Sequence, residues 1–311
     1  MRQLTYEFIV PSGIFLLDIA PWSPLAATRY GFRMQIRKPI AGQQLVKVSP
    51  TVGNEGVDLR YAVMNVDLEA EDGKPNPEWG IPFQLVSECL DWIRILGRQY
   101  LVSALNGGSN NVARGSIISG PRDYVNFGAV QIGIVVAPLS REMWERIGNE
   151  IASCNVPGIP DSMLCDAMVK LHERDFLQAV TLLGVTAELE LNSFIADLLS
   201  RQSGTSRKLY NEKKCRFEEK LKNVLEILEA ESYHKHNDQF EGLLIKLYEL
   251  RGQAVHRAKC ILDGVEIEFS HVAAFIYAVE DFLRWTRGQR KRLGLKTIEA
   301  FDSPIKLMSG D

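Results

Sequence analysis

The sequence lacks several features that would place it in a broad class at once. No apolar run reaches the roughly 18 residues that a membrane-spanning helix needs, so we expect no membrane partner. Residues 8–20 are apolar, but Pro11, Gly13 and Asp18 interrupt them and no basic segment leads in, so a targeting segment is not expected. An excess of basic charge is also absent, because the sequence contains 36 basic and 39 acidic residues. A uniformly basic, duplex-coating surface is thereby excluded, and any nucleic-acid contact has to come from a local patch.

Cysteine is scarce and irregularly placed. The number of cysteines is odd, and no two of them form a Cys-x-x-Cys pair. Such a pattern is typical of reduced, structural thiols in a cytoplasmic protein, and we expect neither a metal nor a cofactor. The five cysteines are Cys89, Cys154, Cys165, Cys215 and Cys260.

The length of 311 residues, with 46% apolar residues, predicts about two domains that each bury a core. Residues 1–158 alternate between strand-like and helical patterns, which predicts an α+β region. Loops are expected at residues 72–77 and 106–111, where Gly, Pro and Asn cluster. We expect strands within residues 4–10, 60–68, 117–118 and 125–136, and helices within residues 82–103 and 140–154.

A break in the pattern at Pro157-Gly158-Ile159-Pro160 predicts the domain boundary, because neither proline can donate a helical hydrogen bond. Beyond it, residues 159–311 carry apolar side chains at helical spacing almost throughout. The predicted fold is therefore an α+β N-terminal region followed by an all-α C-terminal helical bundle. Helices are expected over the apolar stripes that start at Phe176, Phe217, Phe240 and Val272, with Ser270 capping the last.

Two residues of the third stripe could perform chemistry. On a helical wheel Arg251 lies about 40° from Leu247, which belongs to the apolar stripe, whereas His256 lies about 180° away. The two side chains are thus about 140° apart and do not converge within one chain. A second copy related by a two-fold axis could bring them together, because such an axis pairs the same patch from both chains.

Arg251-x4-His256, preceded by Leu-Tyr-Glu-Leu, resembles the Arg-x4–6-His signature of HEPN domains, and most closely the Apea-like subgroup. The segment that begins Ala179-Val180-Thr181 and continues to Ala187-Glu188-Leu189-Glu190 is similar to the first long helix of that family. The resemblance covers roughly residues 160–290 and assigns the C-terminal half to a HEPN-like bundle. Gly252 departs from the family, because many members carry a polar residue directly after the arginine.

The resemblance implies a metal-independent endoribonuclease that acts as a homodimer, in a toxin or anti-phage defence setting. His256 would move the proton of a ribose 2′-hydroxyl, and Arg251 would hold the phosphate that this hydroxyl attacks. Residues 1–158 would then sense a phage- or host-derived trigger. The alternative, which Gly252 favours, is a non-catalytic HEPN-like module for dimerisation and for binding a nucleotide or a protein. In a purely structural interpretation, Arg251 pairs with an acidic residue and His256 is exposed.

Further residues could support such a site. Glu190 lies about 60° from the apolar stripe of its helix and Glu188 about 100°, which predicts that Glu190 pairs with Arg251 and orients it; otherwise it is a solvated charge. A basic run near the C-terminus could follow an RNA backbone, with Trp285 stacking on a base. The competing interpretation, which we favour, is a basic helix end with Trp285 in the core. The basic residues are Arg284, Arg287, Arg290, Lys291 and Arg292.

One histidine pair could ligate a metal. His234 and His236 stand beside Asp238 in an expected loop. Two nearby side chains do not complete a metal site, so we interpret both histidines as solvated.

Overall fold

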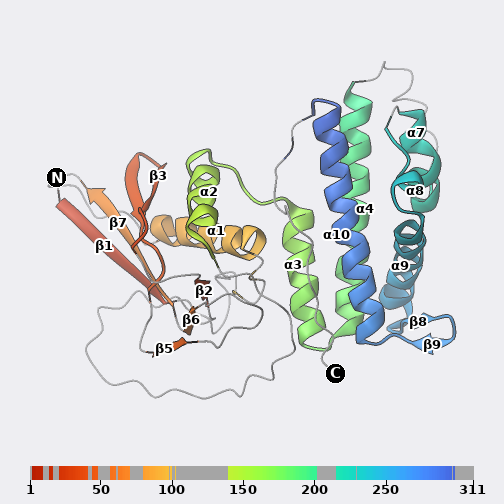
Figure 1. Ribbon diagram of the computed structural model, residues 1–311, viewed down its shortest axis with the longest axis horizontal. Coiled ribbons are helices and arrows are strands. Elements are labelled where there is room, and N and C mark those ends of the chain that lie inside the picture. The colour runs from red at the N-terminus through yellow and green to blue at the C-terminus, as the bar shows by residue number, and fades with distance from the viewer. Residues whose placement is uncertain are drawn as a thin grey trace. The chain divides into compact units, whose positions relative to one another are not determined.

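The computed structural model divides into two compact units between Pro157 and Gly158 (Figure 1). The first unit combines antiparallel sheet with helix, and the second consists mainly of helices, which confirms the expected order of fold classes. The loops expected at residues 72–77 and 106–111 and the strands expected at 117–118 and 125–136 lie outside the described residues. The structure describes residues 2–9, 14–16, 21–40, 44–47, 57–60, 62–70, 80–97, 99, 102, 139–201, 215–228, 230–295 and 297.

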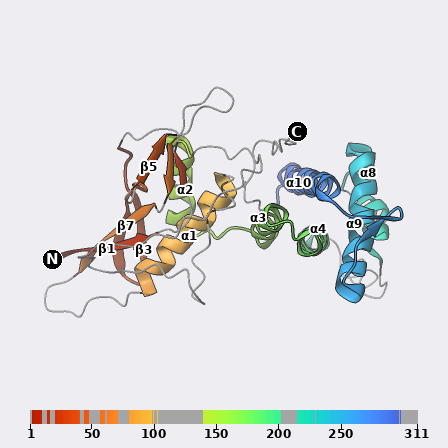
Figure 2. The same cartoon turned by 90° about the horizontal axis from the view of Figure 1, so that it is seen from below.

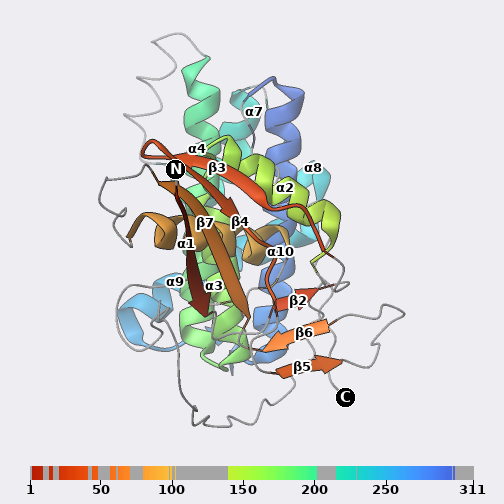
Figure 3. The ribbon, with the colours of Figure 1, turned by 90° about the vertical axis from the view of Figure 1, so that its left-hand side faces the viewer.

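The described strands of the N-terminal unit form two antiparallel sheets, with strand orders β1-β7-β4-β3 and β2-β6-β5 (Figure 3). The first sheet contains strands in two of the four segments for which the sequence predicts them, residues 4–10 and 60–68, and Leu4 of β1 lies opposite Leu68 of β7. The elements of the unit are β1 (Arg2–Ile9), β2 (Ile14–Leu16), β3 (Leu25–Arg29), β4 (Phe32–Ile36), β5 (Gln44–Lys47), β6 (Val57–Arg60), β7 (Val63–Ala70), α1 (Gly80–Leu96) and α2 (Arg141–Ala152).

One face of the four-stranded sheet is apolar and the other is polar, as alternation along a strand dictates. In β4, Met34 and Ile36 are buried while Arg33 and Gln35 are exposed. Helix α1 contacts β1 and β7, and the ring of its Phe83 lies 6.4 Å from that of Phe8. Helix α2 packs along β3 and begins where Ser140 accepts a hydrogen bond from the Met143 amide, as an N-cap residue does.

The C-terminal unit is built around one long helix. Helix α4 contacts α3, α9 and α10, and Figure 2 shows it between α3 and α9. By length and composition α4 could cross a membrane, but 56% of that stretch is buried inside the bundle, as in a core helix. The elements are α3 (Ile159–His172), α4 (Phe176–Ser200), α6 (Phe217–Glu219), the π-helical turn η1 (Lys220–Val224), α7 (Leu225–Ile227), α8 (Tyr233–His236), α9 (Asp238–Arg257), β8 (Ile261–Leu262), β9 (Val265–Glu266) and α10 (Phe269–Arg292).

The bundle departs from the expected helices in two places. The second apolar stripe, from Phe217, is not one α-helix, because a π-helical turn separates two short α-helical pieces. The last helix begins before Ser270, so the predicted cap is wrong. Glu268 precedes α10, and its backbone amide donates to Nδ1 of His271. The start of the helix is therefore fixed by this reciprocal contact rather than by a serine cap.

Candidate functional site

Helix α9 presents Arg251 and His256, and its ends are well defined. Asn237 caps the N-terminus by accepting a hydrogen bond from the Phe240 amide. Ala258 adopts a left-handed conformation, with φ of 49°, just beyond the last helical residue. The buried stripe of α9 consists of Glu241, Leu244, Leu247, Leu250 and Ala254.

The aliphatic stem of Arg251 lies against Gly184 of α4. A Cβ atom at position 184 would approach Arg251 Cβ to 2.8 Å, closer than real Cβ atoms come, and Arg251 Cγ to 3.1 Å, which is unusually tight. Glycine therefore opens a notch in α4 that admits the stem. Arg251 thus borders the core, as its wheel position predicts. Gly184 is not among the residues predicted for this site, although a glycine inside a predicted helix is a signal of close packing.

The guanidinium group of Arg251 is held by Glu188. Arg251 Nη1 lies 2.7 Å from Glu188 Oε2, and both side chains are 29% exposed. The guanidinium carbon also lies 5.8 Å from the centre of the Tyr248 ring, and that ring stacks on Phe217. Arg251 Nε is buried and has no hydrogen-bond partner among the residues that the structure describes. The head of the arginine is therefore oriented but still reaches solvent.

The prediction that Glu190 pairs with Arg251 is wrong. Glu190 accepts hydrogen bonds from Arg290 and from the Thr286 hydroxyl, both on α10. Residues two apart on a helix point about 200° apart, so Glu188 faces α9 while Glu190 faces α10. The wheel correctly predicted that Glu190 is more buried than Glu188, because Glu190 lies nearer the apolar stripe. The helix that packs against Glu190, however, is α10 and not α9.

His256 lies in the last turn of α9 and is exposed. Within the described part of the chain, no hydrogen bond or ring contact joins His256 to Arg251. The structure of one chain therefore does not bring the two residues together, in agreement with their wheel positions.

The C-terminal basic run does not form one exposed track. Arg290 is buried, with its guanidinium bound to Glu190 and Asp197, so its prediction as an RNA-binding residue is wrong. Arg287 pairs with Asp161, and Arg284 with Glu280. Lys291 and Arg292 are exposed. Trp285 is buried against Phe194, Tyr233 and Phe282, which confirms the favoured interpretation of that residue.

Two opposing effects act on the pKa of Arg290. Burial by itself lowers that pKa, and the carboxylates of Glu190 and Asp197 more than offset the effect, so the pKa lies above its ordinary value. Arg290 is therefore a permanent buried cation. The folded protein tolerates this charge only while the carboxylate partners compensate it.

The two histidines of α8 each pair with a carboxylate instead of lying in a loop. His234 Nδ1 lies 2.9 Å from Glu241 Oε2, and His236 Nε2 lies 3.2 Å from Asp281 Oδ2. Among the described residues, no three His, Cys, Asp or Glu side chains are grouped so as to hold a metal ion. The pairs thus fix the short helix against α9 and α10.

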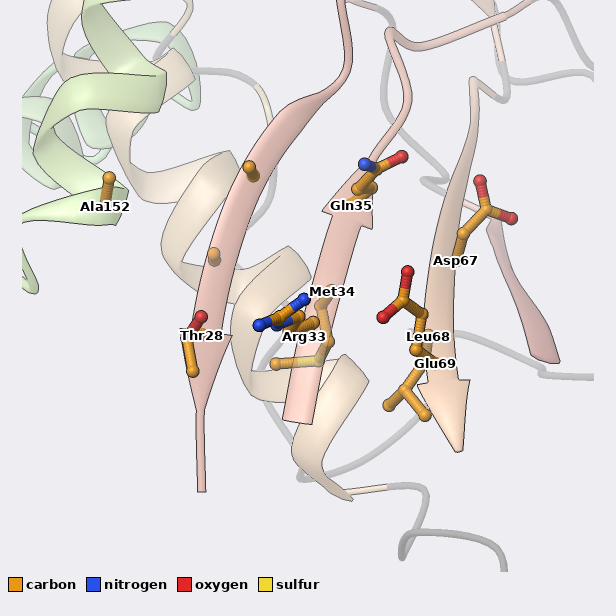
Figure 4. A pocket seen from close by; sticks show the side chains of 10 residues that line it. Thr28, Arg33, Met34, Gln35, Asp67, Leu68, Glu69 and Ala152 are labelled. Atoms are coloured by element: carbon orange, nitrogen blue, oxygen red, sulfur yellow. The ribbon is translucent and has the colours of Figure 1, made fainter. Parts of the chain in front are cut away.

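The N-terminal unit carries a shallow hollow of about 420 Å³ on the polar face of its four-stranded sheet. Figure 4 shows that the lining residues come from β3, β4, β7 and the last turn of α2. Asp67, at one side, is held by Arg37 and by the Thr5 hydroxyl. Arg33 and Glu69 are exposed there, so the hollow offers both signs of charge.

Comparison with known proteins gave no relative: no family model, no curated protein and no solved structure matches this chain. The resemblance to HEPN domains therefore depends on the residues of the sequence alone.

Proposed function

We propose that the C-terminal unit is a HEPN-like bundle that cleaves RNA without a metal ion. The observation that carries the proposal is the setting of Arg251. Its stem lies in the notch over Gly184, and Glu188 fixes its head while leaving it 29% exposed. A phosphate-binding arginine gains affinity from such an arrangement, because orientation before binding reduces the entropy lost on binding.

The proposed reaction is attack of a ribose 2′-oxygen on the adjacent phosphorus. His256 accepts the 2′-hydroxyl proton as the new O–P bond forms. The bond from phosphorus to the 5′-oxygen breaks, and a protonated His256 supplies the proton that this oxygen needs. Arg251 donates hydrogen bonds to the phosphate oxygens as their charge develops. The products are a 2′,3′-cyclic phosphate and a 5′-hydroxyl, and neither water nor an oxidant is consumed.

A homodimer completes the proposed site. Arg251 and His256 point about 140° apart on α9, so one chain presents them to different sides. Two copies packed about a two-fold axis place His256 of one chain beside Arg251 of the other. We propose a cytoplasmic toxin or anti-phage effector, in which the N-terminal unit senses a phage- or host-derived trigger. The polar hollow on its sheet is one described concavity where that contact can be sought.

Two observations favour a second candidate function. Glu188 already neutralises Arg251, and Gly252 follows the arginine where many HEPN proteins have a polar residue. Both features suit a non-catalytic HEPN-like module that dimerises and binds a nucleotide or a protein.

The two candidates are separated by incubating the purified full-length protein with mixed RNA in the presence of a chelator. The enzyme produces fragments with cyclic phosphate ends, and Arg251→Ala produces none. Binding of RNA or nucleotide without any fragments supports the non-catalytic module. Cleavage that stops on chelation contradicts a metal-independent reaction.

A further inference from the structure

A short segment, residues 217–224, joins the two helices that hold the arginine site. It consists of α6 and the π-helical turn η1, and such turns occur often at functional sites. Phe217 is 4% exposed, and its ring stacks on that of Tyr248 on α9, with ring centres 4.9 Å apart and ring planes 8° apart. Lys220 Nζ donates a hydrogen bond of 2.8 Å to Asn192 Oδ1 on α4. The segment is therefore attached to α9 by a ring stack and to α4 by a hydrogen bond.

The attachment to α4 lies directly beside the contacts of Arg251. Gly184, Glu188 and Asn192 follow one another at every fourth residue, so they form one stripe along α4. The stem of Arg251 lies against the first of these residues, and its head pairs with the second. The third accepts the hydrogen bond from Lys220. The segment thus meets the stripe one helical turn beyond the ion pair that holds the arginine.

The ring of Tyr248 restrains the guanidinium group in a way that Glu188 does not. The ion pair holds one atom of the planar group, Nη1, and by itself leaves the plane free to turn. Tyr248 precedes Arg251 by three residues, which places both side chains on one side of α9. The guanidinium carbon lies 5.8 Å from the ring centre, within the range of a cation–π contact, and this contact limits the turning. Nη2 makes no hydrogen bond within the described residues and is left for a ligand.

We propose that residues 217–224 form a clip that positions Arg251 for a phosphate, with Phe217 and Tyr248 as positioning residues. Phe217 holds the ring of Tyr248, and that ring restricts the plane of the guanidinium group. The plane matters because a bidentate contact needs two N–H groups aimed at one phosphate at the same time. This assignment rests on the proposed function of Arg251. It makes that function depend on Phe217, which acts only through the ring of Tyr248.

Hydrogen exchange of the Arg251 Nε–H group tests the clip without reference to RNA cleavage. Nε is buried, so its exchange with solvent should be slow in full-length protein with isotopically labelled arginine, and Arg251→Lys identifies its NMR signal. Tyr248→Leu removes the ring and should speed the exchange about two- to fivefold, which corresponds to a cation–π contact of about 0.5–1 kcal/mol. Tyr248→Phe keeps the ring and loses a hydroxyl that makes no hydrogen bond within the described residues, so it should exchange like the parent.

A substitution at the far end of the clip separates positioning from ordinary packing. Phe217→Leu removes the ring stack and should speed the exchange as Tyr248→Leu does. Its control is Phe240→Leu, the same change at a half-buried position of α9 that lies about 16 Å along the helix from Arg251 and should leave the exchange at the parent rate. Circular dichroism verifies that each variant is folded. The parent exchange rate in both Tyr248→Leu and Phe217→Leu overturns the proposal, as does an equal acceleration in Phe240→Leu.

Steady-state cleavage of a labelled RNA in chelator connects the clip to the proposed reaction. Tyr248→Leu and Phe217→Leu should each lower kcat about 10- to 100-fold, because a misplacement of about 1 Å can cost 10²-fold. KM should change less, since the contact to the phosphate strengthens as charge develops in the transition state. Tyr248→Phe should retain most of the parent kcat, and an unchanged kcat in both leucine variants overturns the positioning role. A parent protein that cuts no RNA contradicts the proposed function instead, and the exchange rates then still decide whether the clip holds Arg251.

Discussion

Gly184 and Arg251 touch so closely that no other residue fits at position 184 without displacing the arginine. A Cβ atom there would lie 2.8 Å from Arg251 Cβ. Because α4 and α9 approach at this point, the glycine sets both the spacing of the two helices and the position of the guanidinium group. Any function that depends on Arg251 therefore also depends on a residue without a side chain.

Gly184→Ala should destabilise the protein even though alanine is the better helix former. Overpacking costs about 1–3 kcal/mol, while the gain in helix propensity is about 1 kcal/mol. The control is Gly288→Ala on α10, where a new Cβ meets nothing within 4 Å, so stability should rise by about 0.5–1 kcal/mol. Urea unfolding measures both changes. A stabilising Gly184→Ala would contradict the notch.

Glu188 and Glu190 should respond to truncation very differently. Glu190→Ala leaves Arg290 and Thr286 without their shared acceptor in a buried setting, and should cost about 3–5 kcal/mol. Glu188→Ala breaks a pair that solvent partly screens, and should cost less than about 1 kcal/mol. Thermal and urea unfolding of the two variants decide the matter. Equal losses would mean that the two carboxylates are buried alike.

Sequence patterns predicted the helices better than the partners of their charged residues. The apolar spacing from Phe176 predicted α4, and Ser140 stands where α2 begins, because both signals are local. Which helix a carboxylate faces is not determined by the local sequence. Glu190 looked suitable for Arg251 on a wheel, yet the packing of α10 against α4 gives it to Arg290. A glycine inside a predicted helix signals close packing, but that Gly184 packs against Arg251 follows only from the position of α9.

Short elements were the second source of error. The stripe from Phe217 has helical spacing, but a wheel cannot distinguish an α-helical turn from the π-helical turn that interrupts it. His234 and His236 looked like loop residues because four-residue helices carry almost no periodic signal. Their carboxylate partners, Glu241 and Asp281, belong to α9 and α10, so tertiary contacts rather than local sequence hold α8.

Asp161 should make stability depend on pH in the opposite sense to an ordinary paired carboxylate. Burial raises its folded-state pKa above the ordinary value of 3.8, so the folded protein binds this proton more tightly than the unfolded chain does. Between those two pKa values the folded state carries more protons, and its stability falls as the pH rises. Asp161→Asn removes the titration. The stability of the parent relative to this variant should therefore fall as the pH rises above about 3.8.

Urea unfolding of both proteins across this pH range, at constant ionic strength, measures the difference. Because both proteins share every other titrating group, those contributions cancel in the subtraction. A difference that grows in favour of the parent with rising pH would show that Arg287 dominates over burial.

His256→Ala tests the proposed reaction most directly. The side chain is exposed and closes no cavity, so its truncation should change stability by less than about 0.5 kcal/mol. Loss of a general acid or base should lower the cleavage rate by about 10²–10⁴. Arg257→Ala, one residue further along α9 and also exposed, removes a charge but no proton-transfer group, and should retain most of the activity. Single-turnover cleavage of a labelled RNA in chelator compares the three proteins. If His256→Ala cuts at the parent rate, the proton is moved elsewhere and the mechanism is wrong. If both substitutions lower the rate equally, the end of α9 binds RNA by charge instead of transferring a proton.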